Sequence, residues 1–185
     1  MTQTEALLSA LRLGNREAFE TIFRTYYGRV FAVAYRLLGS AQEADDVTQE
    51  AFLRLYMRPL PAGREHNLLG WLLRVASNLG YNVLRSRQRR QAHESAEFVE
   101  PAEPAAPTDA LAATDVAQRV RQVLAELPER QVQILLLRNA GLSYAEVAAA
   151  LGIAPGSVGT LLARAEGAFR KRYGELEEIE THVKP

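Results

Sequence analysis

At 185 residues, the chain is long enough for one or two small domains with cores of their own. Hydrophobic residues make up 48% and charged residues 24% of it, as in soluble globular proteins, and no run approaches the roughly 20 apolar residues that cross a bilayer. Cysteine is absent, which excludes disulfides and thiolate metal sites and fits a reducing cytoplasm, and the N-terminus lacks a signal-peptide pattern.

The first predicted helix runs from Asn15, a favourable capping residue, to about Leu38, and Gly39 ends it. Its apolar residues recur at strict helical spacing, which predicts that one side of the helix lies in a core. These residues are Phe19, Ile22, Phe23, Tyr26, Val30, Val33, Ala34 and Leu37.

The second predicted helix starts at a capping box formed by Ser40 and Glu43 and ends near Met57. Its core side carries Ala44, Val47, Ala51 and Leu55. Its opposite side, which we call the docking face, carries Asp46, Gln49, Glu50 and Leu53. An acidic and amide surface with one leucine is typical of a protein-docking site, and a merely solvated face is the alternative.

A metal site at Asp45, Asp46 and Glu50 is a weaker interpretation, because hard cations need several converging oxygens and the folded segments offer no second acidic cluster or histidine pair.

A loop at residues 58–67, marked by two prolines and a glycine, precedes a long predicted helix from Leu68 to about Arg90. Its core stripe is Leu68, Leu72, Val75, Ala76, Leu79 and Val83. Beside it lies a second stripe at helical spacing, here called the aromatic–arginine stripe: Trp71, Arg74, Asn78, Tyr81 and Arg85. Rings stack on unpaired bases and arginines hold phosphates, so this pattern favours single-stranded nucleic acid. The alternative is that Trp71 and Tyr81 pack on a neighbouring helix.

The segment that follows is rich in alanine, proline and glutamate, offers little to bury and predicts a flexible acidic linker. A helix from Asp115 to Glu126 comes next, and its expected inward residues are Val116, Val120, Val123 and Leu124. Together with the helices after it, this segment predicts a second small domain.

A helix-turn-helix pattern occupies residues 127–173. Pro128 and Glu129 favour a helix start, Gly141 breaks that helix, and a capping box of Ser143 and Glu146 starts the next. Gly152 can take the left-handed conformation that ends the second helix. Pro155 opens a third, whose predicted buried stripe is Val158, Leu162, Ala165 and Phe169. Two short helices, a glycine turn and a longer basic helix are typical of DNA binding in the major groove, and a plain three-helix bundle is the alternative.

The formal net charge of +0 hides a segregation of charges along the chain. Arginines cluster at residues 85–90, whereas acidic residues dominate residues 94–109 and 175–180. Because a ligand responds to the local field, a basic segment can still meet nucleic acid.

A melting-type helix, an acidic linker and a C-terminal helix-turn-helix together resemble the sigma factors of bacterial RNA polymerase. The most similar group is the small, two-domain extracytoplasmic-function (ECF) class. The segments that carry the resemblance, in the order of the family, are Tyr27-Gly28-Arg29-Val30, Ala44-Asp45-Asp46-Val47-Thr48-Gln49-Glu50-Ala51-Phe52-Leu53, Gly70-Trp71-Leu72-Leu73-Arg74-Val75-Ala76-Ser77-Asn78, and Leu127-Pro128-Glu129-Arg130-Gln131 through Arg164-Ala165.

The resemblance implies an all-α fold of two small domains and assigns each surface a role. Residues 1–91 would form the polymerase-docking and minus-ten domain, 92–113 the linker, 114–174 the minus-thirty-five domain and 175–185 an acidic tail. The docking face would bind the polymerase, and the aromatic–arginine stripe would open the minus-ten promoter element. The third helix of the C-terminal domain would read the minus-thirty-five element through Ser157, Thr160 and Arg164.

Four positions depart from the family. Gly159 and Leu161 stand where a lysine and an arginine are usual early in the recognition helix, so contacts to the minus-thirty-five element should be weaker. Ala154 stands at the N-cap position and forgoes about 1 kcal/mol of capping. Asn82 replaces a common aspartate, which leaves the role of that position open.

The resemblance implies a specificity subunit that acts in the cytoplasm, since the chemistry belongs to the polymerase. The expected partners are core RNA polymerase and promoter DNA, and an anti-sigma factor is a further candidate because small members commonly have one. No catalytic residue, cofactor, metal, membrane or small-molecule substrate is expected: His66, His93 and His182 have no nucleophile or carboxylate partner at a convincing spacing. The alternative function is a stand-alone helix-turn-helix regulator, which would normally need to dimerise and gives the docking face no purpose.

Overall fold

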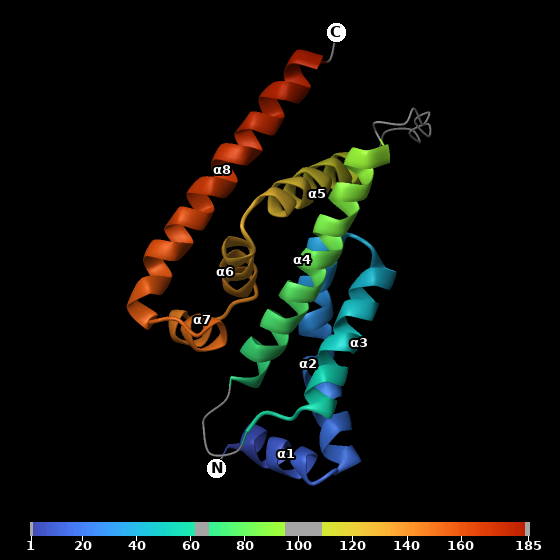
Figure 1. Ribbon diagram of the computed structural model, residues 1–185, viewed down its shortest axis with the longest axis vertical. Helices are drawn as coiled ribbons and strands as arrows, with labels where there is room; N and C mark the ends of the chain where they lie inside the picture. The colour runs from blue at the N-terminus through green and yellow to red at the C-terminus, as the bar shows by residue number, and fades with distance from the viewer. Residues whose placement is uncertain (1, 62–66, 95–108, 184–185) are drawn as a thin grey trace.

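The computed structural model describes residues 2–61, 67–94 and 109–183, and this part of the chain is all-helical, as predicted. In chain order, the elements are α1 (Gln3–Arg12), α2 (Arg16–Leu38), α3 (Ala41–Met57), α4 (Leu68–Glu94), α5 (Asp109–Glu126), α6 (Glu129–Asn139), α7 (Tyr144–Leu151), the 3₁₀ turn η1 (Pro155–Ser157) and α8 (Val158–Val183). Figure 1 shows α2, α3 and α4 running side by side, with α1 across one end and α5 to α8 on the other side of α4.

Local capping explains the start and end of the N-terminal helices. The Asn15 side chain accepts a hydrogen bond from the Ala18 N–H at 3.1 Å, and Gly39 ends α2 at a φ of 71°. The Ser40 hydroxyl caps α3, but the predicted capping box is half formed, because the Glu43 carboxylate pairs with Arg87 of α4. One ion pair therefore ties α3 to α4 at the expense of the second half of the cap.

Helix α1 is absent from the sequence-based prediction, although its signal is present. Thr2 and Glu5 form a complete capping box at its start, and Leu8 and Leu11 are buried against the remaining helices. The helix closes the end of the bundle that lies nearest the start of α4 (Figure 1).

The C-terminal helices have the geometry of a helix-turn-helix. Ser143 and Glu146 form the predicted capping box, with the Ser143 N–H donating to Glu146 Oε2 at 2.7 Å. This bond lowers the pKa of Glu146, because it favours the carboxylate form. Gly152 ends α7 at a φ of 63°, and Ala154 makes no side-chain cap, as expected. The recognition helix α8 begins one turn later than predicted, because Pro155 to Ser157 form the 3₁₀ turn.

Two predicted boundaries fall inside helices. Helix α4 continues to Glu94 and α5 begins at Asp109, so both ends of the predicted linker, 92–113, are helical. The rest of that linker, residues 95–108, lies outside the described residues. The predicted acidic tail is also helical as far as Val183, because α8 continues through it.

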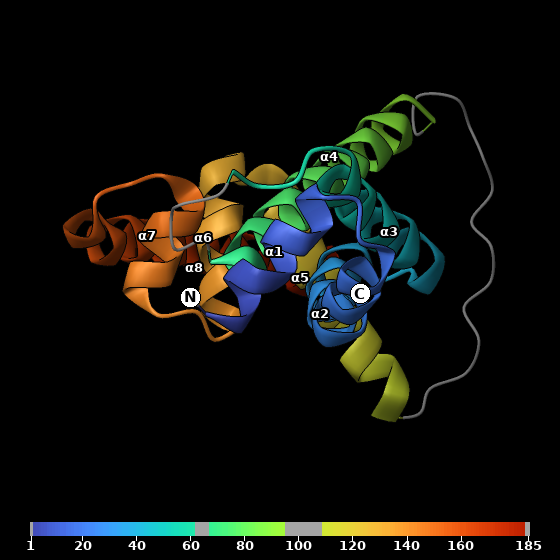
Figure 2. The same ribbon diagram turned by 90° about the horizontal axis from the view of Figure 1, so that it is seen from below.

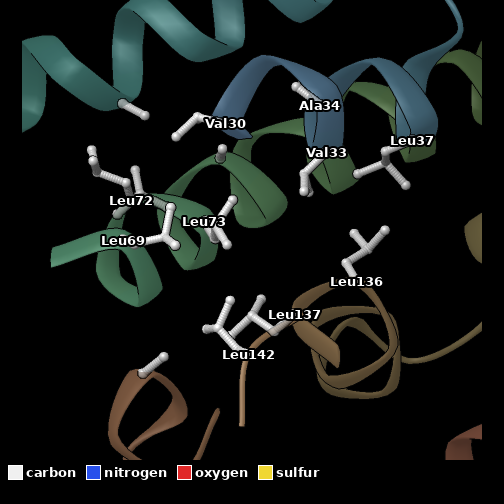
Figure 3. Close-up of a cluster of buried hydrophobic side chains, with 14 of the residues drawn as sticks. Val30, Val33, Ala34, Leu37, Leu69, Leu72, Leu73, Leu136, Leu137 and Leu142 are labelled. Atoms are coloured by element: carbon white, nitrogen blue, oxygen red, sulfur yellow. The ribbon is translucent and has the colours of Figure 1, made fainter. Parts of the chain in front are cut away.

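The helices before and after the linker pack on each other along what we call the seam. In both views, α4 lies between α3 and the C-terminal helices α6 and α7 (Figures 1 and 2). Figure 3 shows Leu136, Leu137 and Leu142 pointing toward leucines and valines of α2 and α4, all of them buried. The two halves of the chain therefore share one continuous core.

The described helices include no single one that is long and apolar enough to cross a membrane. Helix α7 taken together with residues Pro155–Glu178 passes on length and composition, but the two parts meet at a bend of 108°.

Candidate functional site

The docking face lies on the outer side of α3. Asp46 and Gln49 are exposed, Glu50 is half-buried, and Leu53 exposes 49% of its surface. The opposite side of the helix holds Ala44, Val47, Ala51 and Leu55 in the core, as the spacing predicts. Because that core side is fixed, the four residues of the docking face are all presented on the outer side of the helix.

A hollow of about 660 Å³ lies beside these residues, between α2 and α3. Its apolar lining comes from four aromatic residues, Phe19, Phe23, Phe52 and Tyr56, and its rim from Arg16, Asp46, Gln49, Glu50 and Leu53. The aromatic rings brace one another, with the Phe19 and Tyr56 centroids 5.1 Å apart and the Phe23 and Phe52 centroids 4.8 Å apart. An apolar recess beside carboxylates suits a partner that presents an apolar side chain flanked by basic residues.

The carboxylates of α3 are distributed among different partners. Asp45 accepts hydrogen bonds from Gln49 at 2.9 Å and from the Tyr27 hydroxyl, and the bond to Asp45 raises the pKa of Tyr27. Glu50 accepts from Arg54 Nε at 2.8 Å. This arrangement does not support the interpretation of Asp45, Asp46 and Glu50 as a metal site. Within the described residues, no group of three acidic or histidine side chains is placed to hold an ion. Asp46 is left to face solvent at the rim of the hollow.

The aromatic–arginine stripe does share one side of α4, and most of that side faces the seam. Tyr81 exposes 4% of its surface, and its hydroxyl donates to the Leu127 carbonyl at 2.7 Å. The Asn78 side-chain oxygen accepts a hydrogen bond from Gln133 of α6. Trp71 and Arg74 are half-buried, whereas Arg85 is exposed and donates to the Tyr81 hydroxyl at 3.3 Å. In this arrangement, the C-terminal helices cover the centre of the stripe and leave its ends accessible.

The predicted recognition residues are all exposed. Ser157 ends η1, and Thr160 and Arg164 lie on the first turns of α8, while Val158, Leu162 and Ala165 are buried as predicted. Leu161 is partly buried and packs against the core, so it offers no charged group to DNA. A Cβ built on Gly159 would lie 3.6 Å from the Tyr144 ring, an ordinary contact distance, so the fold does not require glycine at this position.

Several residues at the seam carry no sequence signal that marks them as partners. Arg36 of α2 donates to the Asn139 side chain at 2.8 Å, and Arg29 donates to the Ala140 carbonyl at 3.4 Å. The guanidinium of Arg121 lies so close to Gly39 that an added Cβ would be 2.6 Å from its Cζ. These contacts join residues more than 80 positions apart, which spacing along a single helix cannot reveal.

Arg87 belongs to the basic cluster noted in the sequence, but its side chain is used inside the N-terminal half. It pairs with Glu43 and donates to the Leu38 carbonyl at 3.0 Å. Burial lowers the pKa of Arg87, with smaller contributions from Arg121 and Arg90. The cluster at 85–90 is therefore not one uniform surface for nucleic acid.

Comparison with protein families matches two models. Sigma-70 region 2 covers residues 22–90, and the region 4 model of the same family covers residues 117–168. The RNA polymerase sigma-H factor of Pseudomonas aeruginosa is 30% identical over 94% of this chain and 95% of its own length. The ECF sigma factor SigW of Bacillus subtilis is 27% identical over 91% of this chain and 96% of its own length.

The chain belongs to the ECF family of RNA polymerase sigma factors. It directs RNA polymerase in transcription initiation, as the resemblance implied, and the stand-alone regulator is not favoured. Sigma factors are generally not enzymes, which agrees with the expectation of a non-catalytic chain.

Two solved structures share the fold. The structure of CnrH in complex with the cytosolic domain of CnrY matches with a TM-score of 0.63 at 20% identity, over 95% of this chain and 97% of that one. The sigma factor RpoE in complex with the anti-sigma factor NepR from Bartonella quintana matches with a TM-score of 0.53 at 23% identity, over 83% of this chain and 95% of that one.

The region 2 model includes both the docking face and the aromatic–arginine stripe, and the region 4 model includes the recognition residues. The seam of this sigma factor is thus a contact between its region 2 and region 4 helices. Tyr81 is buried at the seam, where its hydroxyl bonds to Leu127. For this ring, the structure agrees with the alternative interpretation, in which the rings of the stripe pack on a neighbouring helix.

Proposed function

We propose that the docking face and its aromatic hollow form the surface by which this sigma factor binds core RNA polymerase. The observation that supports this most is the hollow itself, an apolar recess of about 660 Å³ bordered by Asp46, Glu50 and the exposed Leu53. Binding energy in protein interfaces concentrates where an apolar anchor fills such a recess inside a polar rim. The carboxylates at the rim would favour a polymerase surface with basic residues.

DNA recognition is divided between two surfaces in this proposal. Ser157, Thr160 and Arg164 on α8 would meet intact duplex at the minus-thirty-five element, where the contacts are partly electrostatic. The aromatic–arginine stripe would take bases of the minus-ten element after the strands part, because rings stack only on unpaired bases. With Gly159 and Leu161 on the recognition helix, the minus-ten domain would carry more of the specificity than is usual in the family.

The remaining expectations follow from this role. The chain would act in the cytoplasm as a specificity subunit, with residues 1–91 and 114–174 as its two functional domains and 92–113 as the linker between them. An anti-sigma factor is a proposed further partner, since the solved sigma factor RpoE, which shares this fold, is in complex with the anti-sigma factor NepR.

Transcription in vitro tests the proposal directly. Core polymerase would be incubated with the purified chain and a genomic DNA library, and the 5′ ends of the transcripts would be sequenced. We expect initiation at a small set of sites that share two spaced elements, together with co-elution of the chain and the core enzyme on size exclusion. Initiation that is unchanged by the chain, without co-elution, would refute the polymerase role.

A further inference from the structure

We propose that a polar pocket between α2, α4 and α5 binds a small molecule that carries a phosphate monoester on a hydroxylated body, such as a sugar phosphate. The pocket has a volume of about 280 Å³, and both charged side chains in its lining are arginines, Arg87 and Arg121. It uses no residue of the docking face, the aromatic–arginine stripe or the recognition helix, so it is a separate site. The remaining lining residues are Leu38, Gly39, Ser40, Leu84, Gln88, Gln118, Gln122 and Ala125.

The fold brings the two guanidiniums of the pocket together from distant parts of the chain. Arg87 lies on α4, and Arg121 lies on α5, which packs on both α2 and α4 (Figure 1). The Arg121 guanidinium lies against the backbone of Gly39, where an added Cβ would be 2.6 Å from its Cζ. Any other residue would also be strained there, because φ is 71°. Gly39 therefore both ends α2 and leaves room for an arginine of the pocket.

The positive charge of the pocket is only partly balanced. Arg87 donates to Glu43 Oε1 and to the Leu38 carbonyl, each at 3.0 Å. Within the described residues, Arg121 makes no hydrogen bond or ion pair. Burial lowers the pKa of Arg87, and the charges of Arg121 and Arg90 lower it further, as expected for like charges held near one another. A bound anion would remove this repulsion.

The charges favour a phosphate monoester over other common anions. A guanidinium pairs with phosphate oxygens through parallel hydrogen bonds, and a monoester carries about −1.5 to −2 charges at pH 7. A carboxylate, or the phosphodiester of a nucleic acid, carries a single charge and would balance one arginine. Glu43 offsets part of the positive charge, but Arg90 adds to it, as does the N-terminal end of α3, which starts at Ser40 beside the pocket.

The rest of the lining suits the body of a small polar molecule. The side chains of Gln88, Gln118 and Gln122 offer both donors and acceptors, as hydroxyl groups require. None of the three makes a side-chain hydrogen bond within the described residues. A volume of about 280 Å³ is at the small end of ligand sites, which span about 300–1,000 Å³, so a sugar-sized body suits the pocket better than a dinucleotide.

Isothermal titration calorimetry of the full chain, with ribose 5-phosphate as the probe, provides the first test. We expect saturable binding to the wild type and an affinity at least about tenfold lower in Arg121→Gln, because charge-assisted hydrogen bonds are the strong ones. The fold should tolerate this change, since Arg121 has no hydrogen-bond or ion-pair partner within the described residues, and circular dichroism checks that it does.

Arg89→Gln is the matched control for that titration. Arg89 belongs to the same basic cluster as Arg87, but it is exposed and does not line the pocket. Its loss should leave the affinity nearly unchanged. An equal loss in Arg89→Gln and Arg121→Gln would indicate unspecific attraction and overturn the proposal, as would a wild-type titration without saturation up to about 10 mM probe.

Two further probes test the class of ligand. Inorganic phosphate has the charge without the body, and dimethyl phosphate is a diester like the backbone of DNA. We expect both to bind more weakly than ribose 5-phosphate. Gln118→Ala with Gln122→Ala should lower the affinity for ribose 5-phosphate but not for inorganic phosphate. If inorganic phosphate binds as tightly as ribose 5-phosphate, no body is recognised, and if dimethyl phosphate does, the site takes a nucleic-acid backbone; either result would overturn the proposal.

Thermal unfolding gives an independent measurement, because the ligand would bind one arginine of α4 and one of α5 and so stabilise their contact. At about ten times its dissociation constant, ribose 5-phosphate should raise the melting temperature of the wild type by roughly 3–6 °C. The same concentration should hardly change that of Arg121→Gln, and an equal rise in both would overturn the proposal. The transcription assay uses no such ligand, so failure of the pocket leaves the polymerase role intact, and the reverse also holds.

Discussion

The docking face and the aromatic–arginine stripe lie on neighbouring helices, and the same helical spacing predicts both. In the structure, however, they differ in their exposure to solvent. The docking face is open to solvent beside an aromatic hollow, whereas the centre of the stripe is covered by region 4. Spacing along a helix identifies which residues share a side. What covers that side depends on contacts with distant segments.

The chemistry of the two surfaces explains the difference. Asp46 and Glu50 are charged and would lose hydration on burial, so a face that carries them stays exposed. Tyr81 and Asn78 are uncharged and can be buried once each has a hydrogen-bond partner, which Leu127 and Gln133 supply. Of the charged members of the stripe, Arg74 is partly exposed and Arg85 is exposed.

The largest effect is expected on the open surface. Glu50→Lys combined with Leu53→Ala should weaken binding to core polymerase by about 2 kcal/mol or more, because it reverses a rim charge and removes an exposed apolar anchor. The melting temperature should hardly change, since the Glu50–Arg54 pair that is lost is solvent-exposed. Fluorescence titration with labelled core enzyme measures the affinity, and thermal unfolding followed by circular dichroism measures the stability.

Glu166→Lys is the matched control for that experiment. Glu166 forms an exposed pair with Arg170 at 3.7 Å with the same four-residue spacing as Glu50 and Arg54, and neither residue lines the hollow. Undiminished polymerase affinity in the double variant, or an equal loss in Glu166→Lys, would contradict the assigned role of the docking face.

A smaller effect is expected on the covered surface. Trp71→Ala should slow strand opening by an amount that corresponds to about 1 kcal/mol or slightly more, because one stacking ring is lost at the accessible end of the stripe. Formation of the closed promoter complex should be spared, and a template with a pre-melted bubble should largely rescue transcription. Permanganate footprinting of thymines in the minus-ten element measures the opening rate.

The bubble template also serves as the control for folding. Trp71 is half-buried and packs partly on the core, so its loss also lowers stability somewhat. A misfolded variant would fail on both templates, whereas a variant that lacks only a stacking ring fails on duplex alone. If Trp71→Ala opens duplex at the wild-type rate, the ring is a packing residue and the melting role is wrong.

Much of the fold could be predicted because its helices start and end on local signals. Asn15, Ser143 and Gly152 act in the structure as they do in the prediction. The half-formed cap at Ser40 shows the limit of such signals, since Glu43 has a partner in Arg87, 44 residues further along the chain. Helix α1 is absent from the sequence prediction, although the capping box of Thr2 and Glu5 marks its start.

Helical periodicity predicts which residues of a functional surface share one side of a helix, but it does not predict contacts between helices. The four docking residues were assigned to one side of one helix, and they are on it. Phe19 and Phe23 pack against the core, as their spacing predicts, and they also extend the docking surface onto α2, which spacing alone does not reveal. The seam is beyond sequence reasoning of this kind, because Tyr81 and Leu127 meet across 46 residues.

The smallest effect is expected on a third surface, which is exposed like the docking face but meets DNA like the stripe. Arg164→Ala should weaken the closed promoter complex about two- to fivefold and reduce the salt slope of binding by about one, because one phosphate contact is lost. Unlike Trp71→Ala, it should be helped little by a pre-melted bubble, since recognition of duplex at the minus-thirty-five element precedes opening. Arg24→Ala, which removes an exposed arginine of α2, is the control and should leave the salt slope unchanged. Filter binding of holoenzyme to duplex promoter over a range of salt concentrations measures both quantities. An unchanged slope in Arg164→Ala would mean that exposure on the recognition helix is not enough to identify a DNA contact, and that the minus-ten surface carries promoter selection alone.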